Sequence, residues 1–263
     1  MFGSLTSLAG SNKTDVGERL LNTAANQSIR HLFSQSESVE VDIRCQPSSK
    51  ILQGSIDSFK MNGTGLVIRR AFEVEQMSFE TDAVALDFGS VLKGQIRLKQ
   101  PTQAIAKVVL SEAGINKAFE AELVQKRLQN ISTPELTDIA GDEPISFTDV
   151  TVKLLPENQV QISTKANLPE QGLVPVCVIC TLAVERRRRI TFETPQFQAQ
   201  EIPDQIEPVS RQLTQAFVQI LNNMVDLDRF DLDGARLRIN RLETKDKQLI
   251  FNGYAQIERF PKT

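Results

Sequence analysis

The fold is decided by residues 72–128, which read FEVEQMSFETDAVALDFGSVLKGQIRLKQPTQAIAKVVLSEAGINKAFEAELVQKRL. Their apolar side chains first recur at every second position, which places each set on one face of a β-strand. These sets are Phe72 and Val74, then Val84, Leu86 and Phe88, then Ile96 and Leu98, and finally Ala104, Ala106, Val108 and Leu110. The period then changes, because Ser111 can cap a helix and Ile115 and Phe119 lie one helical turn apart. A run of strands that leads into an apolar helix predicts a curved sheet closed by helices.

The flanking segments continue this pattern in both directions. Before the stretch we predict a helix over 14–33, a strand over 39–45, a strand over 51–61 with a bulge near Gly54, and a turn at 62–65. After it we predict a loop over 131–144, a hairpin of strands 148–154 and 160–166, a strand over 173–184 buried on both faces, a strand over 190–195, a helix from Pro208, and a closing hairpin with its tip at 244–247. The predicted fold class is α+β, with a long curved antiparallel β-sheet that wraps amphipathic helices.

Composition is that of a soluble globular protein. Of the 263 residues, 40% are hydrophobic and 24% are charged, and the net charge of −3 argues against a dedicated nucleic-acid binder. No apolar run reaches the ~20 residues needed to span a bilayer. Residues 1–13 carry neither the basic region nor the continuous apolar region of a signal peptide. We therefore expect a flexible tail over 1–13 and a cytoplasmic protein that can bind a membrane peripherally.

A search for catalytic or metal-binding chemistry finds little. His31 is the only histidine, whereas hydrolytic triads and most zinc sites need imidazole. Cys177 and Cys180 have the spacing of a redox pair, but they lie inside a predicted strand, where residues three apart point to opposite faces. The four aspartates within 226–233 lack the ligand spacing of a calcium loop. We predict no enzyme activity, no metal and no cofactor.

The basic run at 186–189 is the one unusual charge feature. It lies between two apolar strand segments and is expected at a hairpin tip. Such a tip is either simply solvated or attracted to anionic lipid headgroups, where each basic residue contributes ~1 kcal/mol near a charged membrane. We take four residues as candidates for headgroup contact on an anionic membrane: Arg186, Arg187, Arg188 and Arg189.

Several of these stretches together resemble the LmeA-like phospholipid-binding family, over most of residues 15–261. The resemblance is carried by ILQGSIDSFKMNGTGLVIR, by residues 72–119, by GLVPVCVICTLAVE and by LRINRLETKDKQLIFNGYAQIERF. The family implies a tubular lipid-binding fold, in which a long curved antiparallel sheet wraps helices around an apolar tunnel, here as one domain over 14–263. Without an export signal the chain is similar to cyanobacterial members, which favours a cytosolic lipid carrier or membrane-associated factor.

The resemblance implies non-catalytic phospholipid binding, with lipid carriage or transfer at the cytosolic face of a membrane. Burial of an acyl chain is worth ~0.8 kcal/mol per CH₂, so an apolar tunnel can hold a lipid without a cofactor. The expected wall consists of Phe79, Leu86, Phe88, Ile115, Phe119, Leu213, Phe217, Ile220 and Met224. The alternative is a protein-interaction scaffold with a solid core, because the sequence does not separate a filled core from a lined cavity. No protein partner is indicated.

Overall fold

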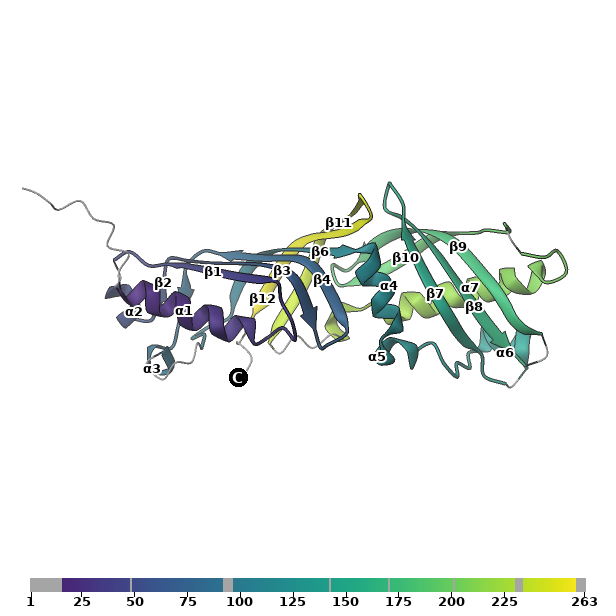
Figure 1. The fold of residues 1–263 in the computed structure, drawn as a ribbon, viewed down its shortest axis with the longest axis horizontal. Coiled ribbons are helices and arrows are strands. Elements are labelled where there is room, and N and C mark those ends of the chain that lie inside the picture. The colour runs from purple at the N-terminus through teal and green to yellow at the C-terminus, as the bar shows by residue number, and fades with distance from the viewer. Residues whose placement is uncertain are drawn as a thin grey trace, which may run out of the picture.

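The computed structural model describes residues 16–47, 49–91, 97–141, 143–169, 171–200, 202–229 and 234–258. Within these ranges the chain forms an elongated molecule with two lobes, each built on an antiparallel sheet (Figure 1). The helices are α1 (Val16–Arg30), α2 (Ser49–Leu52), α3 (Phe88–Val91), α4 (Glu112–Glu120), α5 (Glu122–Gln125), α6 (Pro134–Ala140), α7 (Glu207–Met224) and the 3-10 helix η1 (Leu227–Arg229). The predicted α+β class is confirmed, and the predicted tail over 1–13 lies outside the described residues.

The first lobe is built on a six-stranded sheet in the order β1-β3-β4-β6-β12-β11. The strands are β1 (Ser38–Arg44), β3 (Ser58–Ile68), β4 (Phe72–Thr81), β6 (Thr102–Ser111), β11 (Ala235–Lys245) and β12 (Gln248–Ile257). A small sheet of β2 (Ser55–Ile56) and β5 (Val84–Ala85) extends from the ends of β3 and β4. Ala25 and Ile29 of α1 pack with Ile43, Met61 and Leu66 in a hydrophobic cluster.

The second lobe is built on a four-stranded sheet in the order β10-β9-β8-β7, and α7 packs on one of its faces (Figure 1). The strands are β7 (Ser146–Leu154), β8 (Gln159–Leu168), β9 (Gly172–Glu185) and β10 (Arg189–Phe197). All pairings in both sheets are antiparallel. Neither sheet is closed, so the predicted lipid-binding tube is not confirmed.

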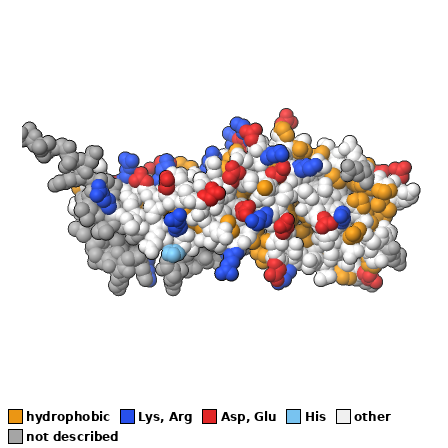
Figure 2. Space-filling view, in the orientation of Figure 1, with side chains coloured by type: hydrophobic (Ala, Val, Ile, Leu, Met, Phe, Trp, Pro, Cys, Tyr) orange, Lys and Arg blue, Asp and Glu red, His pale blue; other side chains and the backbone are white. Residues whose placement is uncertain are grey.

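The described helices pack on only one face of the second sheet, so the side chains on the two faces of strand β9 differ in burial. Val174, Val176 and Val178 are buried on the inner face, toward α7. Leu173, on the outer face that points away from α7, is 58% exposed. The prediction that this strand is buried on both faces is wrong, because no described element covers the outer face. Figure 2 shows hydrophobic side chains gathered on the second lobe, among charges of both signs.

Most other predicted elements are confirmed, with shifts of a few residues at their ends. The helices predicted over 14–33 and from Pro208 correspond to α1 and α7. The predicted hairpins correspond to β7-β8 and β11-β12. At the start of α4 the Ser111 hydroxyl accepts a hydrogen bond from the Gly114 N–H at 3.1 Å, as an N-cap should. The predicted strand position Ile96 lies outside the described residues.

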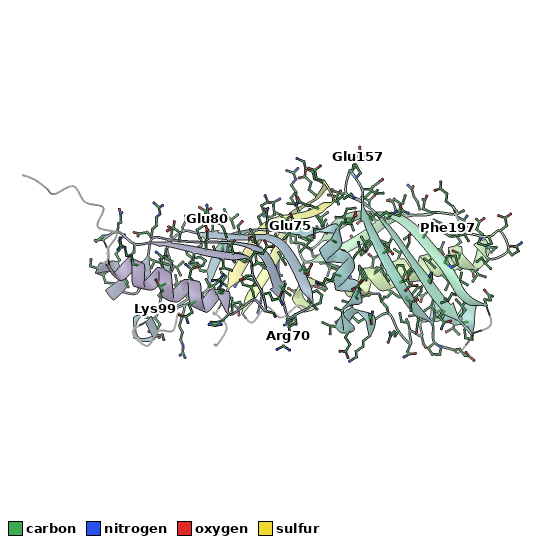
Figure 3. All side chains as sticks on the ribbon, viewed as in Figure 1. Arg70, Glu75, Glu80, Lys99, Glu157 and Phe197 are labelled. Carbon is green, nitrogen blue, oxygen red and sulfur yellow. The ribbon has the colours of Figure 1, made fainter. Side chains whose placement is uncertain are left out.

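Four local predictions are wrong. Phe88, predicted to continue the strand of Val84 and Leu86, begins the helix α3. Residues 49–52 form the short helix α2 instead of starting a strand, and 134–140 form α6 within the predicted loop. The predicted turn at 62–65 lies inside β3, and the chain reverses at Arg69 and Arg70, which adopt φ angles of 51° and 63° (Figure 3). Two consecutive positive φ angles suit a two-residue hairpin, but Asn and Gly usually supply them. An Arg-Arg turn therefore carries little signal in the sequence.

Asparagine side chains bind the backbone of the edge strands. On β1, the Asn22 side chain of α1 accepts a hydrogen bond from the Ile43 N–H at 2.7 Å and donates one to the Ile43 carbonyl at 3.3 Å. On β7, the Asn116 side chain of α4 binds the N–H and carbonyl of Val152 in the same way, at 2.7 and 2.9 Å. Each amide occupies the place where a further strand would pair.

The other two edges are bound by the same residue type. On β10, the Asn222 side chain of α7 accepts a hydrogen bond from the Phe192 N–H at 2.7 Å and donates to its carbonyl at 3.5 Å. On β11, the Thr244 N–H donates to the Asn158 side chain at 3.0 Å. Asn158 follows Glu157 in the β7-β8 turn, labelled in Figure 3, so this bond joins the two lobes. We call Asn22, Asn116, Asn158 and Asn222 the edge asparagines.

The change Asn222→Ala should lower the free energy of unfolding by about 1–3 kcal/mol, because it leaves the Phe192 N–H and carbonyl without their side-chain partner. Urea unfolding followed by circular dichroism measures this difference. The matched control Gln219→Ala changes an exposed residue of the same helix and should alter the free energy by less than about 0.5 kcal/mol. Equal stability of the two variants would contradict a role for the Asn222 amide.

Candidate functional site

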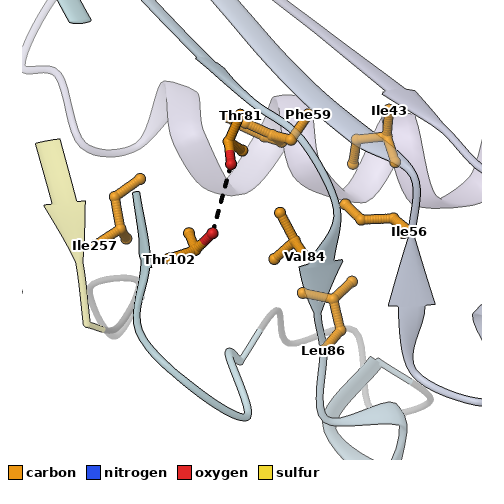
Figure 4. A pocket seen from close by; sticks show the side chains of 8 residues that line it. All are labelled: Ile43, Ile56, Phe59, Thr81, Val84, Leu86, Thr102 and Ile257. Carbon is orange, nitrogen blue, oxygen red and sulfur yellow. Dashed lines mark hydrogen bonds between the residues drawn. The ribbon is translucent and has the colours of Figure 1, made fainter. Parts of the chain in front are cut away.

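An apolar recess lies in the first lobe, at the end of the six-stranded sheet (Figure 4). The large sheet contributes one wall, and the small sheet β2-β5 contributes the other. The lining residues are Ile43, Ile56, Phe59, Thr81, Val84, Leu86, Thr102 and Ile257. Strand register brings them together, since Phe59 pairs with Thr81, Ile56 with Val84, and Thr102 with Ile257.

The recess offers apolar surface and no charged group. The hydroxyls of Thr81 and Thr102 are hydrogen-bonded to each other at 3.4 Å, so they satisfy one another. The cavity volume is about 10 Å³, roughly the space of one water molecule. Pockets for small-molecule ligands usually enclose about 300–1,000 Å³. An acyl chain can therefore enter only if the walls move apart.

The residues predicted to form a lipid-binding wall do not surround one space. Phe79 and Leu86 pack in the first lobe, and Leu86 alone among the described wall residues lines the recess. Six others pack in the second lobe: Ile115, Phe119, Leu213, Phe217, Ile220 and Met224. Phe88 begins α3, and its side chain lies outside the part of the chain that the structure describes.

The packing around α7 is that of a filled core. Leu213 and Phe217 have 0% of their surface exposed, and the Phe217 ring centroid lies 4.8 Å from that of Phe147 in β7. Ile220 and Met224 are partly buried against the same cluster. The part of α7 in lipid binding thus stays a prediction, and the solid-core alternative fits this lobe.

Most recess residues were missed by sequence reasoning. Ile43, Phe59 and Ile257 follow the ordinary alternation of half-buried strands, and nothing marks them as lining a space. What unites the recess residues is position: they cluster at one end of the large sheet, next to the small one. Strand register could have found them, but register requires the turns, and the first predicted turn was misplaced.

The basic run at 186–189 forms the tip of the β9-β10 hairpin, as predicted, but the tip is not free. Its first two residues adopt positive φ angles of 50° and 59°. The carbonyl oxygen of Arg187 accepts a hydrogen bond from the Ile239 N–H of β11 at 2.7 Å, and that of Arg188 accepts one from the Leu227 N–H of η1 at 2.8 Å. The hairpin tip is therefore fixed against the first lobe.

Three of the four arginines form ion pairs within the protein, and the two partly buried ones, Arg188 and Arg189, form the closer pairs. The Arg188 guanidinium lies 2.8 Å from the Asp228 carboxylate, and the Arg189 guanidinium lies 3.4 Å from Glu185. Asp228 also pairs with Arg238 at 2.7 Å. The hydrogen bonds from Arg188 and Arg238 lower the pKa of Asp228 below its ordinary value of 3.8. Arg188 and Arg189, which were predicted to contact lipid headgroups, thus hold the hairpin tip in place.

Arg186 and Arg187 are exposed at the tip. The Arg186 guanidinium lies 3.7 Å from Glu185, a loose contact between well-exposed side chains. Arg187 forms no ion pair with any residue that the structure describes. These two cations are accessible to an anionic partner.

The two cysteines of the CxxC pair point to opposite faces of β9, as predicted. Cys180 is buried in the core, and burial raises the pKa of its thiol to about 11. Cys177 is half-buried on the outer face, where the Ser163 hydroxyl and the Gln161 amide donate hydrogen bonds to its sulfur at 3.3 and 3.4 Å. Facing apart, the two thiols do not form a redox pair.

Among the described residues, no group of three or more His, Cys, Asp or Glu side chains is placed to hold a metal ion. Asp226 and Asp228 instead lie beside arginines, and 231–233 lies outside the described part. No described helix combines the length and apolar character needed to cross a membrane.

Open antiparallel sheets, helices packed on them and an uncharged recess define the class of protein, an α+β protein with an apolar recess. The chain belongs to the LmeA-like phospholipid-binding family, whose model matches residues 13–253. This match confirms the resemblance drawn from the sequence. The family is described by phospholipid binding and not by a reaction. No curated protein and no solved structure matches the chain.

The change Arg188→Ser should lower the free energy of unfolding, because it removes a charge-assisted hydrogen bond to Asp228. Arg187→Ser, the matched control, should change it by less than about 0.5 kcal/mol. A carboxyl with a lowered pKa stabilises the fold only while it is ionised. The difference between the variants should therefore shrink as the pH falls below 3.8. Denaturant unfolding at pH 7 and pH 3 measures both effects, and a pH-independent difference would contradict the ion pair.

A thiol reagent at pH 8 should label Cys177 before Cys180. The thiolate is the reactive form, and a pKa of about 11 leaves roughly one Cys180 thiol in a thousand ionised at that pH. Burial adds a steric barrier, so Cys180 should react only after unfolding in denaturant. Mass spectrometry of peptides from the labelled protein gives the rate at each position. Native labelling of Cys180 as fast as Cys177 would overturn this assignment.

Proposed function

We propose that this protein binds phospholipid without catalysis and that an acyl chain enters the recess of the first lobe. The family description supports phospholipid as the ligand class. The observation that carries the site is the lining, which is apolar apart from two threonine hydroxyls that bind each other. Such a surface favours a hydrocarbon chain over a charged headgroup, because it offers no partner for a buried charge.

The small sheet β2-β5 is the wall best placed to move. It has two strands of two residues each, and the chain beside it is held by the hydrogen bonds from Leu86 N–H to the Gly54 carbonyl and from Lys99 N–H to the Ala85 carbonyl, at 2.7 and 2.9 Å. The facing wall belongs to the six-stranded sheet, in which longer ladders of hydrogen bonds pair β3 with β4 and β6 with β12. Burial of a chain at ~0.8 kcal/mol per CH₂ would offset the separation of so short a sheet.

We also propose that this binding takes place at the cytosolic face of an anionic membrane and serves lipid carriage. Two observations support it: the exposed cations Arg186 and Arg187, and the phospholipid described for the family. The net charge of −3 does not prevent such contact, since charges beyond a Debye length of ~8 Å are largely screened.

The change Thr102→Trp should abolish phospholipid binding, because an indole at this partly exposed position fills the recess. Ile105→Trp is the matched control. It lies on the same strand but points to the opposite side, with 74% of its surface exposed, and it should bind lipid like the unchanged protein. Mass spectrometry of lipid extracted from gently purified protein, and titration with a fluorescent acyl-chain phospholipid, measure occupancy and affinity.

The same measurements separate the rival sites and the rival function. If Thr102→Trp and Ile105→Trp bind the same amount of lipid, the recess is not the lipid-binding site. Loss of lipid in Ile220→Trp, with Thr102→Trp unaffected, would place the chain at α7. Absence of lipid from the unchanged protein in both measurements would favour an interaction scaffold with a solid core.

A further inference from the structure

The outer face of the four-stranded sheet carries a strip of uncharged side chains along β9. Leu173 is 58% exposed, and Pro175, Cys177 and Ile179 alternate after it on the same face, partly exposed. We call these four residues the β9 strip. From first to last it extends about 20 Å along the strand. It lies on the lobe where Figure 2 shows hydrophobic side chains gathered.

The neighbours of the β9 strip place little net charge beside it. Cys177 is paired with Ser163 in β8, and Ser163 and Gln161 are uncharged. Lys165, opposite Pro175, is neutralised by Asp149 at 2.9 Å. On the other side Glu193 stands opposite Thr181, beyond the end of the strip. The strip is thus a nearly neutral, partly apolar surface at the centre of a sheet face.

The tip of the β9-β10 hairpin, residues 186–189, lies at the end of this same face, and we call it the arginine tip. Strand alternation puts Glu185 on the side of Cys177 and Ile179, because their numbers differ by even steps. Arg186 and Arg189 both lie near the Glu185 carboxylate, so their guanidinium groups reach that face.

Charge at the tip is unbalanced toward positive. Its described cluster contains five guanidinium groups, from Arg186, Arg187, Arg188, Arg189 and Arg238. It contains three carboxylates, from Glu185, Asp226 and Asp228. Five minus three leaves a surplus of two positive charges, beside an uncharged strip, in a chain whose net charge is −3.

We propose that the β9 strip and the arginine tip together form the surface that docks on an anionic phospholipid bilayer. The inference rests on the proposed function for its ligand class and adds the face that meets the membrane. An apolar strip alone or two cations alone would bind weakly, but one surface presents both, as peripheral membrane binding requires. The tip is already fixed by its bonds to Ile239 and Leu227, so little ordering is lost on docking.

Cys177, at the centre of the β9 strip, provides a footprint of the docked face. Vesicles of phosphatidylcholine with phosphatidylglycerol should slow its reaction with a thiol reagent at least fivefold at low salt. Vesicles of phosphatidylcholine alone should not, and high salt should restore the rate. An unchanged rate on protein that co-sediments with the anionic vesicles would overturn the proposal, because another face would then hold the membrane.

Co-sedimentation of variants tests the two components separately. Arg187→Glu should weaken binding to anionic vesicles about tenfold, whereas the control Lys107→Glu, an equal charge change on the outer side of β6, should have a much smaller effect. Leu173→Ser should weaken binding more than Ile105→Ser, a matched loss of an exposed aliphatic side chain. If the two variants of each pair weaken vesicle binding equally, the proposal that this surface docks on the membrane is contradicted.

Failure of docking and failure of the recess give different results. Thr102→Trp protein should lose bound lipid and still show vesicle protection of Cys177. If vesicles protect Cys177 in the unchanged protein and that protein carries no lipid, only the proposed lipid site in the recess is contradicted. If Thr102→Trp loses its lipid and vesicles do not protect Cys177 in the unchanged protein, only the proposed docking surface is contradicted.

Discussion

The structure depends on how the edges of two open sheets are satisfied. An edge strand presents N–H and carbonyl groups that can pair with another chain, and a closed barrel removes that hazard. Here the edge asparagines bind the edges from α1, α4, α7 and the β7-β8 turn. One amide carries a donor and an acceptor, so it can reproduce the pairing of a neighbouring strand at one residue. Directional bonds therefore hold the helices on the sheets, in addition to apolar contact.

The same bonds set the relation between the lobes. Asn158, in the β7-β8 turn of the second lobe, binds β11 of the first lobe. Asn116 lies in α4, which directly follows β6 of the first lobe, and binds β7 of the second. The described residues form two hydrophobic clusters: the first lies in the first lobe, and the second joins the second lobe to Ile239, Leu242 and Leu249 of β11 and β12. Leu110 packs against both clusters. The apolar interior of the described residues is thus divided. The recess belongs to the first cluster and most of the predicted wall to the second, which is why the wall does not surround one space.

Sequence periodicity predicted what depends on local pattern and missed what depends on register. The strand-to-helix change at Ser111, the last helix and the hairpins of the second lobe follow from alternation and capping. The turn at Arg69 and Arg70 did not, because its positive φ angles are imposed by the strands and not favoured by the residues. The recess gathers residues as distant as Ile43 and Ile257, a juxtaposition that only the complete strand order specifies.

The two proposals place chain binding and membrane contact in different lobes. The recess includes the start of β6 at Thr102, whereas the end of β6 leads through Ser111 into α4, which binds the second sheet. The two ends of this ten-residue strand are about 30 Å apart. Because hydrogen bonds at β7, β11 and the hairpin tip fix one lobe to the other, docking of the second lobe also fixes how the recess is presented. A chain site and a docking surface in different lobes suit the proposed carriage of a lipid better than chemistry on a lipid that stays in the bilayer.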